Sequence, residues 1–400
     1  MKITITPQKL RGSIPAIPSK SAAHRLLICA ALADKETLIR CDKTSADIDA
    51  TAACLSAMGA KILRGGDNFT VTPGNAPKKA LLDVGESGST LRFLLPVLCA
   101  LGQEAEITMH GRLPDRPMEP LWSLLIANGA KLEKPCREVI SVSGKLTGTD
   151  FTIAADVSSQ YISGLLFSLP LLGGGSVHLT GKVESEGYIR MTVQALAAFG
   201  IHVRWEGSTI TVSGTYRSPG KTNVEGDWSN AAFWLAADAL CGNVQCTGLL
   251  EDSCQGDKAV VQALRDIRRG NAAVDASQIP DLVPILAVVG ALTPGTTHIT
   301  GASRLRLKES DRLQTVRQML TDLGGSVTEM QDGLIIYGQP SLAGGTTCSC
   351  GDHRIAMAAA IASIGCEGPV IIEGAEAVNK SYPRFFSDFA ILGGQCKEEA

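Results

Sequence analysis

The chain has 400 residues, of which 44% are hydrophobic, 19% are charged and only 4% are aromatic, and its formal net charge is -3. This length is enough for a large core and for about two or three domains. The small net charge lacks the basic field of most nucleic-acid-binding proteins, and the few aromatic residues argue against surfaces that stack bases. We therefore expect no nucleic-acid partner.

The first residues, MKITITP, alternate like a β-strand and lack the apolar run of a signal peptide. No apolar run approaches the roughly 20 residues that a membrane span needs. The 12 cysteines include no C-x-x-C pair, and the closest pairs, Cys348 with Cys350 and Cys241 with Cys246, lack zinc-finger spacing. We expect a cytoplasmic protein that binds no membrane, metal or other cofactor, with reduced cysteines that are small core residues.

From Ser19 onward one pattern recurs: a polar or glycine-rich entry, a very apolar helix, a glycine turn and a β-branched strand that ends near glycine. Because these helices are apolar nearly all round, we expect them to be buried. No capping repeat is visible, which argues against a solenoid. The six copies span residues 19–41, 83–111, 156–181, 224–248, 275–301 and 349–374.

Amphipathic second helices lie between the copies, end in glycine and lead into a strand. Their polar face predicts a position nearer solvent, and strands such as KITIT and GLIIYG alternate as in a half-exposed sheet. The pattern predicts an α/β protein of β-α-β-α-β units around buried helices, in two halves of three units each. The Pro- and Gly-containing segment 215–227 is the sharpest candidate boundary.

Cations and hydroxyl residues stand at the starts of the buried helices, although a cation near a helix N-terminus is unfavourable by roughly 0.3–1 kcal/mol. Parallel helices would bring these starts to one face of each half, where free N–H groups, serines and arginines make anion sites. We therefore predict a cleft for an anionic small molecule. The helix starts offer Lys20, Ser21, Arg25, Gly85, Ser87, Gly88, Ser89, Arg92, Ser158, Ser159, Gln160, Asp281, Asp352, His353 and Arg354.

Loops add further candidate groups. Glu309 beside Lys308 is a plausible acid/base pair, and Asp281 is a candidate base at a buried helix start. The chain has no G-x-x-x-x-G-K-[ST] and no complete G-x-G-x-x-G, which argues against P-loop and dinucleotide-binding chemistry. The loop cations are Arg112, Arg116, Arg304, Arg306, Lys308, Arg312, Lys380 and Arg384.

Seven short stretches carry a family resemblance: SKSAAHR, GESGSTLRF, DRPM, SSQYISGLL, RLKESDR, GDHRIAM and NKSYPRFF. Each is modest alone, but together, in this order between Leu10 and about Leu392, they resemble the 5-enolpyruvylshikimate-3-phosphate synthases. The resemblance implies a monomeric, two-domain inside-out α/β barrel of six βαβαββ units, with buried parallel helices and outer sheets. It implies one domain at 1–13 plus 225–400, another at 14–224, and a site between them that closes on substrate.

The resemblance implies transfer of the enolpyruvyl group of phosphoenolpyruvate to the 5-hydroxyl of shikimate 3-phosphate, with release of phosphate through a tetrahedral intermediate and without a metal. Glu309 is then the proton donor to the methylene carbon, Asp281 the base, and Lys20 the third catalytic residue. The implied shikimate 3-phosphate ligands are Lys20, Ser21, Arg25, Ser158, Ser159, Gln160, Ser185, Asp281 and Lys308. The implied phosphoenolpyruvate ligands are Lys20, Gly88, Arg92, Arg116, Gln160, Arg312, Arg354 and Lys380.

Three features depart from the family pattern. Glu86 and Arg304 each stand where the family commonly has Asn, and the carboxylate of Glu86 would repel phosphoenolpyruvate unless it faces an arginine or points away. The short spacing between the fourth and fifth copies implies that a hairpin has been lost there, far from the site of the reaction. Gly88 leaves room for the family's herbicide glyphosate, so inhibition that competes with phosphoenolpyruvate is expected.

Two alternatives remain open at this point. The sister enolpyruvyl transferases act on a UDP-N-acetyl sugar, such as UDP-N-acetylglucosamine, but use Asn after the first lysine and a loop cysteine as the acid. Here Ser21 follows Lys20, and the matching loop GRLPDRPM has no cysteine. A non-catalytic anion-binding protein of the same fold is the second alternative, which turnover by the purified protein would separate from an enzyme.

Overall fold

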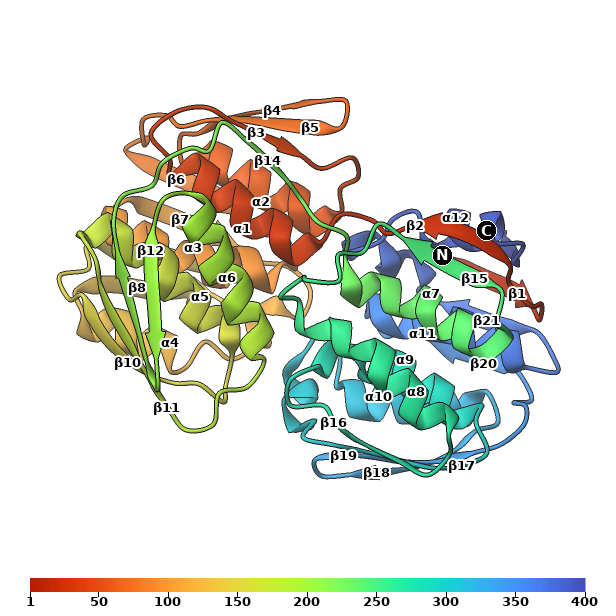
Figure 1. Cartoon of the computed structure of the whole chain (residues 1–400). Helices are drawn as coiled ribbons and strands as arrows, with labels where there is room; N and C mark the ends of the chain where they lie inside the picture. Colours follow the sequence, from red (N-terminus) through yellow and green to blue (C-terminus); the bar gives the residue numbers. More distant parts are fainter. Residues whose placement is uncertain (400) are drawn as a thin grey trace. The chain divides into compact units, whose positions relative to one another are not determined.

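The computed structural model describes residues 1–399 and divides into two compact units. The inserted unit is Pro18–Glu225, and the discontinuous unit is Met1–Ile17 together with the chain from Gly226 onward (Figure 1). The division therefore falls after residue 17 and not after residue 13. The reason is that β2 (Gly12–Pro15) pairs in parallel with β15 (Val244–Thr247), which keeps residues 12–15 in the discontinuous unit.

The inserted unit repeats one sheet pattern three times. Its sheets have the orders β14-β3-β5-β4, β6-β7-β9-β8 and β10-β11-β13-β12, each with one parallel pair followed by antiparallel pairs. The strands are β3 (Thr37–Arg40), β4 (Lys61–Gly65), β5 (Asn68–Thr72), β6 (Lys79–Asp83), β7 (Glu104–Thr108), β8 (Ala130–Cys136), β9 (Val139–Gly144), β10 (Asp150–Ala154), β11 (Gly175–Thr180), β12 (His202–Glu206), β13 (Thr209–Ser213) and β14 (Lys221–Asn223). The helices are α1 (Lys20–Ala31), α2 (Ala46–Ala57), α3 (Gly88–Leu101), η1 (Leu113–Asp115), α4 (Leu121–Ala127), α5 (Ser159–Ser168), η2 (Leu169–Leu172) and α6 (Glu186–Ala198).

The discontinuous unit has the four-stranded sheets β16-β17-β19-β18 and β20-β21-β1-β22, but β15 pairs only with β2. The predicted loss of a hairpin from the fourth repeat is therefore confirmed. The other strands are β1 (Lys2–Thr6), β16 (Ala272–Asp275), β17 (Gly295–Thr300), β18 (Ser326–Met330), β19 (Gly333–Gly338), β20 (Gly345–Cys348), β21 (Val370–Glu373) and β22 (Gln395–Glu399). The helices are α7 (Trp228–Cys241), η3 (Gly256–Ala259), α8 (Val260–Arg268), η4 (Pro280–Leu282), α9 (Val283–Ala291), η5 (Ser303–Leu307), α10 (Arg312–Asp322), α11 (His353–Ala362), η6 (Ser363–Gly365), η7 (Ala375–Lys380) and α12 (Phe385–Ile391).

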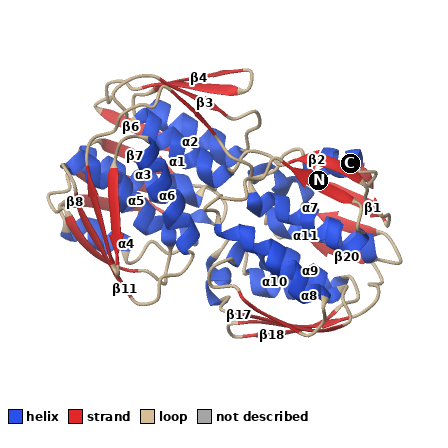
Figure 2. Cartoon of the chain, viewed as in Figure 1, coloured by secondary structure: helices blue, strands red, loops and turns tan. Residues whose placement is uncertain are grey.

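Within each unit the helices gather inside and the sheets lie outside (Figure 2). Every residue of α9 and α11 is buried, whereas α8 buries only Val260, Leu264 and Ile267. The all-round apolar sequence of the first kind of helix makes burial favourable on every face, while the amphipathic kind has one face for the core. The predicted α/β fold of six repeated units with buried helices is confirmed.

The last element among residues 1–399 is the strand β22. β22 pairs antiparallel with β1, so segments from both ends of the chain share one sheet of the discontinuous unit. Within residues 1–399 no helix is both long and apolar enough to cross a membrane. In the same range no three His, Cys, Asp or Glu side chains are grouped as a metal site would require.

The prediction that the cysteines are core residues is wrong for part of the set. Cys29, Cys41, Cys54, Cys99 and Cys366 are buried, but three are exposed: Cys136, Cys348 and Cys350. The physical reason is position, because the exposed cysteines lie at the ends of edge strands or in the turn that follows.

Candidate functional site

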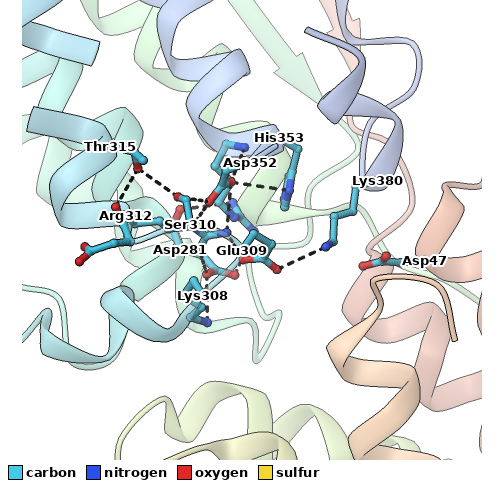
Figure 3. Close-up of polar contacts among 12 residues, drawn as sticks. Asp47, Asp281, Lys308, Glu309, Ser310, Arg312, Thr315, Asp352, His353 and Lys380 are labelled. Atoms are coloured by element: carbon cyan, nitrogen blue, oxygen red, sulfur yellow. Dashed lines mark hydrogen bonds and ion pairs between the residues drawn. The ribbon is translucent and has the colours of Figure 1, made fainter. Parts of the chain in front are cut away.

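A group of charged side chains in the discontinuous unit lies where η4, α10, α11 and η7 start or end (Figure 3). Four cations and three carboxylates meet there, so cations are present that could bind an anion. We call this group the Arg312 cluster. Its members are Asp281, Lys308, Glu309, Arg312, Asp352, Arg354 and Lys380.

Arg312 is the centre of this cluster and is only 1% exposed. It donates from Nη1 to Asp281 Oδ1 at 2.8 Å, from Nη2 to Glu309 Oε2 at 2.7 Å and from Nε to Asp352 Oδ2 at 2.7 Å. Burial acts to lower its pKa, but the carboxylates of Asp352, Glu309 and Asp281 outweigh burial and raise it. The guanidinium is therefore a permanent cation held in a fixed orientation.

Asp281, in η4, connects Arg312 to a second arginine. Its Oδ2 accepts from Arg354 Nη2 at 2.9 Å, and Lys308 Nζ lies 3.5 Å from its Oδ1. Burial would raise the pKa of Asp281, but Arg354, Lys308 and Arg312 hold it well below its usual range. The carboxylate is therefore ionised in this state, and its strength as a base depends on how tightly these cations hold it.

Asp352 performs two tasks at the start of α11. Its side chain caps the helix by accepting from the backbone N–H of Arg354 at 3.0 Å, and it also accepts from Arg312 and from Ser310 Oγ. Because Asp352 is fully buried, these contacts fix the relative positions of the α10 and α11 starts. The sequence places Asp352 at a helix start, but its ion pair with Arg312 was not predicted.

Glu309, the predicted proton donor, lies in the turn between η5 and α10. Its carboxylate contacts Arg312 at 2.7 Å and lies 4.0 Å from Lys380 Nζ at the end of η7. The sequence-predicted residues Asp281, Lys308, Glu309, Arg312, Arg354 and Lys380 are thus gathered into one group. A site that combines partly buried carboxylates with several cations is suited to proton transfer beside an anion.

In the inserted unit, α1 begins as expected from its sequence. The hydroxyl of Ser19 caps the helix by accepting from the N–H of Ala22, and the helix starts at Lys20. Lys20 Nζ lies 2.8 Å from Asp47 Oδ2 on α2. This carboxylate offsets the unfavourable charge of Lys20 near the helix N-terminus, and no sequence signal pointed to Asp47 as its partner.

Arg25 lies one turn further along α1 and is 2% exposed. It donates from Nε to Thr192 Oγ1 at 2.8 Å and from Nη2 to the carbonyl oxygen of Tyr188 at 2.9 Å, both on α6. Its guanidinium carbon also lies 4.9 Å from the centre of the Phe93 ring. Arg25 therefore links α1 to α6 and α3 inside the unit, in addition to any role at a ligand.

Gly88 and three polar residues form a second group, which we call the Arg92 cluster: Gly88, Arg92, Arg116 and Gln160. Arg92 Nη1 donates to Gln160 Oε1 at 2.7 Å, and Gln160 Nε2 donates to Ser89 Oγ at 2.9 Å. A Cβ on Gly88 would lie 2.9 Å from Arg116 Nη1 and 3.0 Å from Arg92 Nη1. Both guanidinium groups therefore crowd the first residue of α3, and a side chain there would displace them.

The predicted serines lie at three helix starts of the same unit. Ser158 caps α5 by accepting from the N–H of Gln160 at 3.3 Å, and Ser159 is the first residue of that helix. Ser185 precedes α6 with a φ of 54°, in the left-handed region. Ser21 lies on the first turn of α1, where its carbonyl oxygen accepts from Arg25 Nη1 at 2.6 Å.

The two side chains that depart from the family pattern, Glu86 and Arg304, make different contacts. Glu86 is exposed, and its Oε1 lies 2.3 Å from where a Cβ on Gly111 would be, so its carboxylate packs against that glycine. Only glycine leaves space for it there, and φ is +56° at Gly111. Arg304 donates from Nη2 to the carbonyl oxygen of Ser277 at 2.9 Å, which fastens η5 to the segment that leads to Asp281.

Comparisons with known proteins agree on one family. A family model described as EPSP synthase (3-phosphoshikimate 1-carboxyvinyltransferase) matches residues 5–389. The chain is 40% identical to a 3-phosphoshikimate 1-carboxyvinyltransferase of Clostridium kluyveri and 41% identical to one of Clostridium acetobutylicum, with 99% of this chain and 98% of each relative covered. A solved EPSP synthase from Acinetobacter baumannii superimposes with a TM-score of 0.82 at 25% identity, covering 99% of this chain and 100% of that one.

Proposed function

The chain belongs to the EPSP synthase family of 3-phosphoshikimate 1-carboxyvinyltransferases, and we infer from this that it transfers the enolpyruvyl group of phosphoenolpyruvate to the 5-hydroxyl of shikimate 3-phosphate. This is a step of the shikimate pathway, which leads to chorismate and the aromatic amino acids. The family relationship does not favour the UDP-N-acetyl sugar alternative. The single structural observation that supports the activity best is the Arg312 cluster, which holds two candidate acid/base carboxylates among four cations.

The reaction needs one proton delivered to carbon and one removed from oxygen. We assign the delivery to Glu309, which protonates the methylene carbon of phosphoenolpyruvate while the 5-hydroxyl oxygen bonds to the neighbouring carbon. Asp281 takes the hydroxyl proton, and a tetrahedral intermediate results. Loss of phosphate and of one proton from the new methyl group then gives the enolpyruvyl ether.

The contacts of Glu309 and Asp281 support a substrate-dependent change in their proton affinity. Both carboxylates are held by Arg312, and Lys380 or Arg354 provides a second cation to each. The phosphate and carboxylate groups of an incoming substrate compete for these cations. The ion pairs of the cations with Glu309 and Asp281 are weakened as a result. The proton affinity of both carboxylates then rises, which favours a protonated Glu309 and a stronger base at Asp281.

We assign the remaining binding roles from the chemistry of each position. Arg92, Arg116, Arg312, Arg354 and Lys380, with Gly88, bind phosphoenolpyruvate. Shikimate 3-phosphate is bound by serine hydroxyls, helix starts and cations, which suit a phosphate. Lys20 and Gln160 contact both substrates. The shikimate 3-phosphate ligands are Lys20, Ser21, Arg25, Ser158, Ser159, Gln160, Ser185, Asp281 and Lys308.

Phosphate release by the purified, chelator-treated protein tests this function. We expect release only when both substrates are present, because addition of the hydroxyl precedes departure of phosphate. Release from phosphoenolpyruvate alone would indicate hydrolysis and not transfer. No release, with either substrate still raising the Tm, would support the anion-binding alternative.

Glyphosate tests the phosphoenolpyruvate assignment separately. We propose that it inhibits by competing with phosphoenolpyruvate, because the absence of a side chain at Gly88 leaves the guanidinium groups of Arg92 and Arg116 undisplaced for an anionic inhibitor. Activity unchanged at millimolar inhibitor would contradict this. A monomeric, cytoplasmic enzyme without a nucleic-acid or membrane partner also remains part of the proposal, and sedimentation velocity tests the monomer.

A further inference from the structure

Two exposed cysteines flank a buried serine just before α11. Cys348 ends the outer strand β20 and Cys350 lies in the turn that follows, while Ser349 between them is fully buried. The enolpyruvyl transfer assigned above uses neither thiol. Cys350 has a φ of 52°, in the left-handed region that is unusual for a residue with a side chain.

The turn brings the two thiols together. The backbone N–H of Cys350 donates to Cys348 Sγ at 3.2 Å, so the Cys348 sulfur lies directly over the backbone of Cys350. A disulfide needs its sulfurs about 2 Å apart, and the side chain of Cys350 already hydrogen-bonds with that of Cys348, so the two sulfurs are neighbours. Partial burial together with the neighbouring Cys348 sulfur raises the pKa of Cys350 to about 11.

These observations separate the reactive roles of the two thiols. Cys350 keeps its proton at neutral pH and lies where it can share that proton with the sulfur of Cys348. Cys348 is exposed, and its sulfur also accepts the N–H bond of Cys350. Cys348 is therefore the thiol that attacks first, and Cys350 is the one that resolves.

We propose that Cys348 and Cys350 form a reversible modification site that closes to an intramolecular disulfide by exchange with a low-molecular-weight disulfide. The Cys348 thiolate attacks one sulfur of the small disulfide and displaces the other as a thiolate. The Cys350 thiolate, formed by loss of its proton to solvent, then attacks Cys348 Sγ and displaces the second small thiolate. One small disulfide is reduced to two thiols, and the two protein thiols lose two electrons and two protons.

The position of the pair connects it to the Arg312 cluster. Ser349 makes four hydrogen bonds: its N–H donates to the carbonyl of Glu373, its Oγ donates to the carbonyl of Gly374 and accepts from the N–H of Gly351, and its carbonyl accepts from the N–H of Asp352. Closing a small ring through Ser349 strains this segment, and Asp352 is the carboxylate that orients Arg312. This consequence rests on the proposed function: we expect the disulfide to raise the KM for phosphoenolpyruvate several-fold with a smaller effect on kcat.

Mass spectrometry after treatment with oxidised glutathione tests the site without using activity. Free thiols are blocked with iodoacetamide before trypsin digestion. The tryptic peptide 318–354 contains Cys348 and Cys350 and no other cysteine, and the peptide 132–137 contains only the exposed Cys136. We expect 318–354 to lose two hydrogens without gaining glutathione, while 132–137, which holds a single thiol, gains glutathione.

Substitution of each cysteine identifies which thiol attacks first and which one resolves. In Cys350→Ser we expect peptide 318–354 to retain glutathione on Cys348, and in Cys348→Ser we expect much slower modification. Glutathione retained on the wild-type 318–354 peptide, or no change there while 132–137 reacts, would overturn the proposed site.

Kinetics test the connection to the Arg312 cluster. The rise in the KM for phosphoenolpyruvate should appear on oxidation of wild type and of Cys136→Ser, reverse with dithiothreitol, and be absent in Cys348→Ser. A disulfide that forms but leaves the KM unchanged would overturn this connection. Inactivity of the reduced enzyme would instead count against the proposed function and leave the mass result standing.

Discussion

His24, on the second turn of α1, shows how burial sets the properties of a single residue. It is fully buried, its Nδ1 lies 2.6 Å from Thr51 Oγ1, and Thr51 contacts Thr90 Oγ1 at 2.6 Å on α3. Burial lowers the pKa of His24 to about 3; the carboxylate of Asp47 opposes this shift, and Lys20 and Arg25 add to it. The folded protein therefore holds His24 neutral in a polar chain that joins α1, α2 and α3.

The lowered pKa predicts a loss of stability in acid. Between the unfolded value of 6.5 and the folded value of about 3, the unfolded chain binds the extra proton, so the free energy of unfolding falls as pH falls. Between pH 7 and pH 4.5 the titration of His24 lowers the free energy of unfolding by about 2–3 kcal/mol. Urea unfolding at both pH values should show that the free energy of unfolding falls less in His24→Asn than in wild type. His202→Asn, at an exposed histidine, should keep the wild-type loss, and equal losses in all three proteins would contradict the prediction.

Asp352 is the residue whose loss should affect binding and stability together. Asp352→Asn leaves the buried Arg312 with one fewer carboxylate, and breaking a buried charge pair in this way costs about 3–5 kcal/mol. We expect lower stability and a KM for phosphoenolpyruvate raised about ten-fold. Asp311→Asn is the matched control, because Asp311 also caps a helix, α10, but its ion pair is with the more exposed Arg306. Equal effects of the two substitutions on KM would contradict a specific role for Asp352.

At the scale of elements, the packing of α3 against α5 brings Arg92 close to Gln160. A Cβ on Gly164 would lie 2.3 Å from the carbonyl oxygen of Arg92, so glycine is required for the helices to approach this closely. Gly164→Ala should separate them, lower the free energy of unfolding by roughly 1–3 kcal/mol and raise the KM for phosphoenolpyruvate. Gly65→Ala, where a Cβ meets nothing within 4 Å, serves as the control. An unchanged KM in Gly164→Ala would show that the Arg92 cluster tolerates the separation.

The elements were largely predictable, because hydrophobic pattern and glycine position act locally. The apolar helices, the shortened fourth repeat and the cations at helix starts all follow from residues adjacent in sequence. The pairs Lys20 with Asp47 and Arg312 with Asp352 did not follow, since they join side chains from different helices. The exposure of Cys348 and Cys350 was missed because an outer strand end and a helix start look alike in composition.

At the scale of the molecule, each unit has its own hydrophobic core and its own group of anion-binding candidates. The chain enters the inserted unit after Ile17 and leaves it after Glu225, so neither unit is completed by chain from the other. The proposed reaction nevertheless draws on both, since Lys20 and Arg92 belong to one unit and Glu309 and Asp281 to the other. Substitutions in either unit should therefore impair the same chemical step.

Glu309 as the proton donor is the central claim, and turnover in deuterium oxide tests it most directly. Because the donor exchanges with solvent and protonates the methylene carbon, the wild-type product should carry deuterium in its enolpyruvyl methylene. Glu309→Gln should lower the rate of product formation and of deuterium incorporation by at least about a hundred-fold. Glu329→Gln, which alters a carboxylate outside the Arg312 cluster that pairs with Arg306 and Arg317, should retain both rates. Deuterated product formed by Glu309→Gln at the wild-type rate would contradict this account.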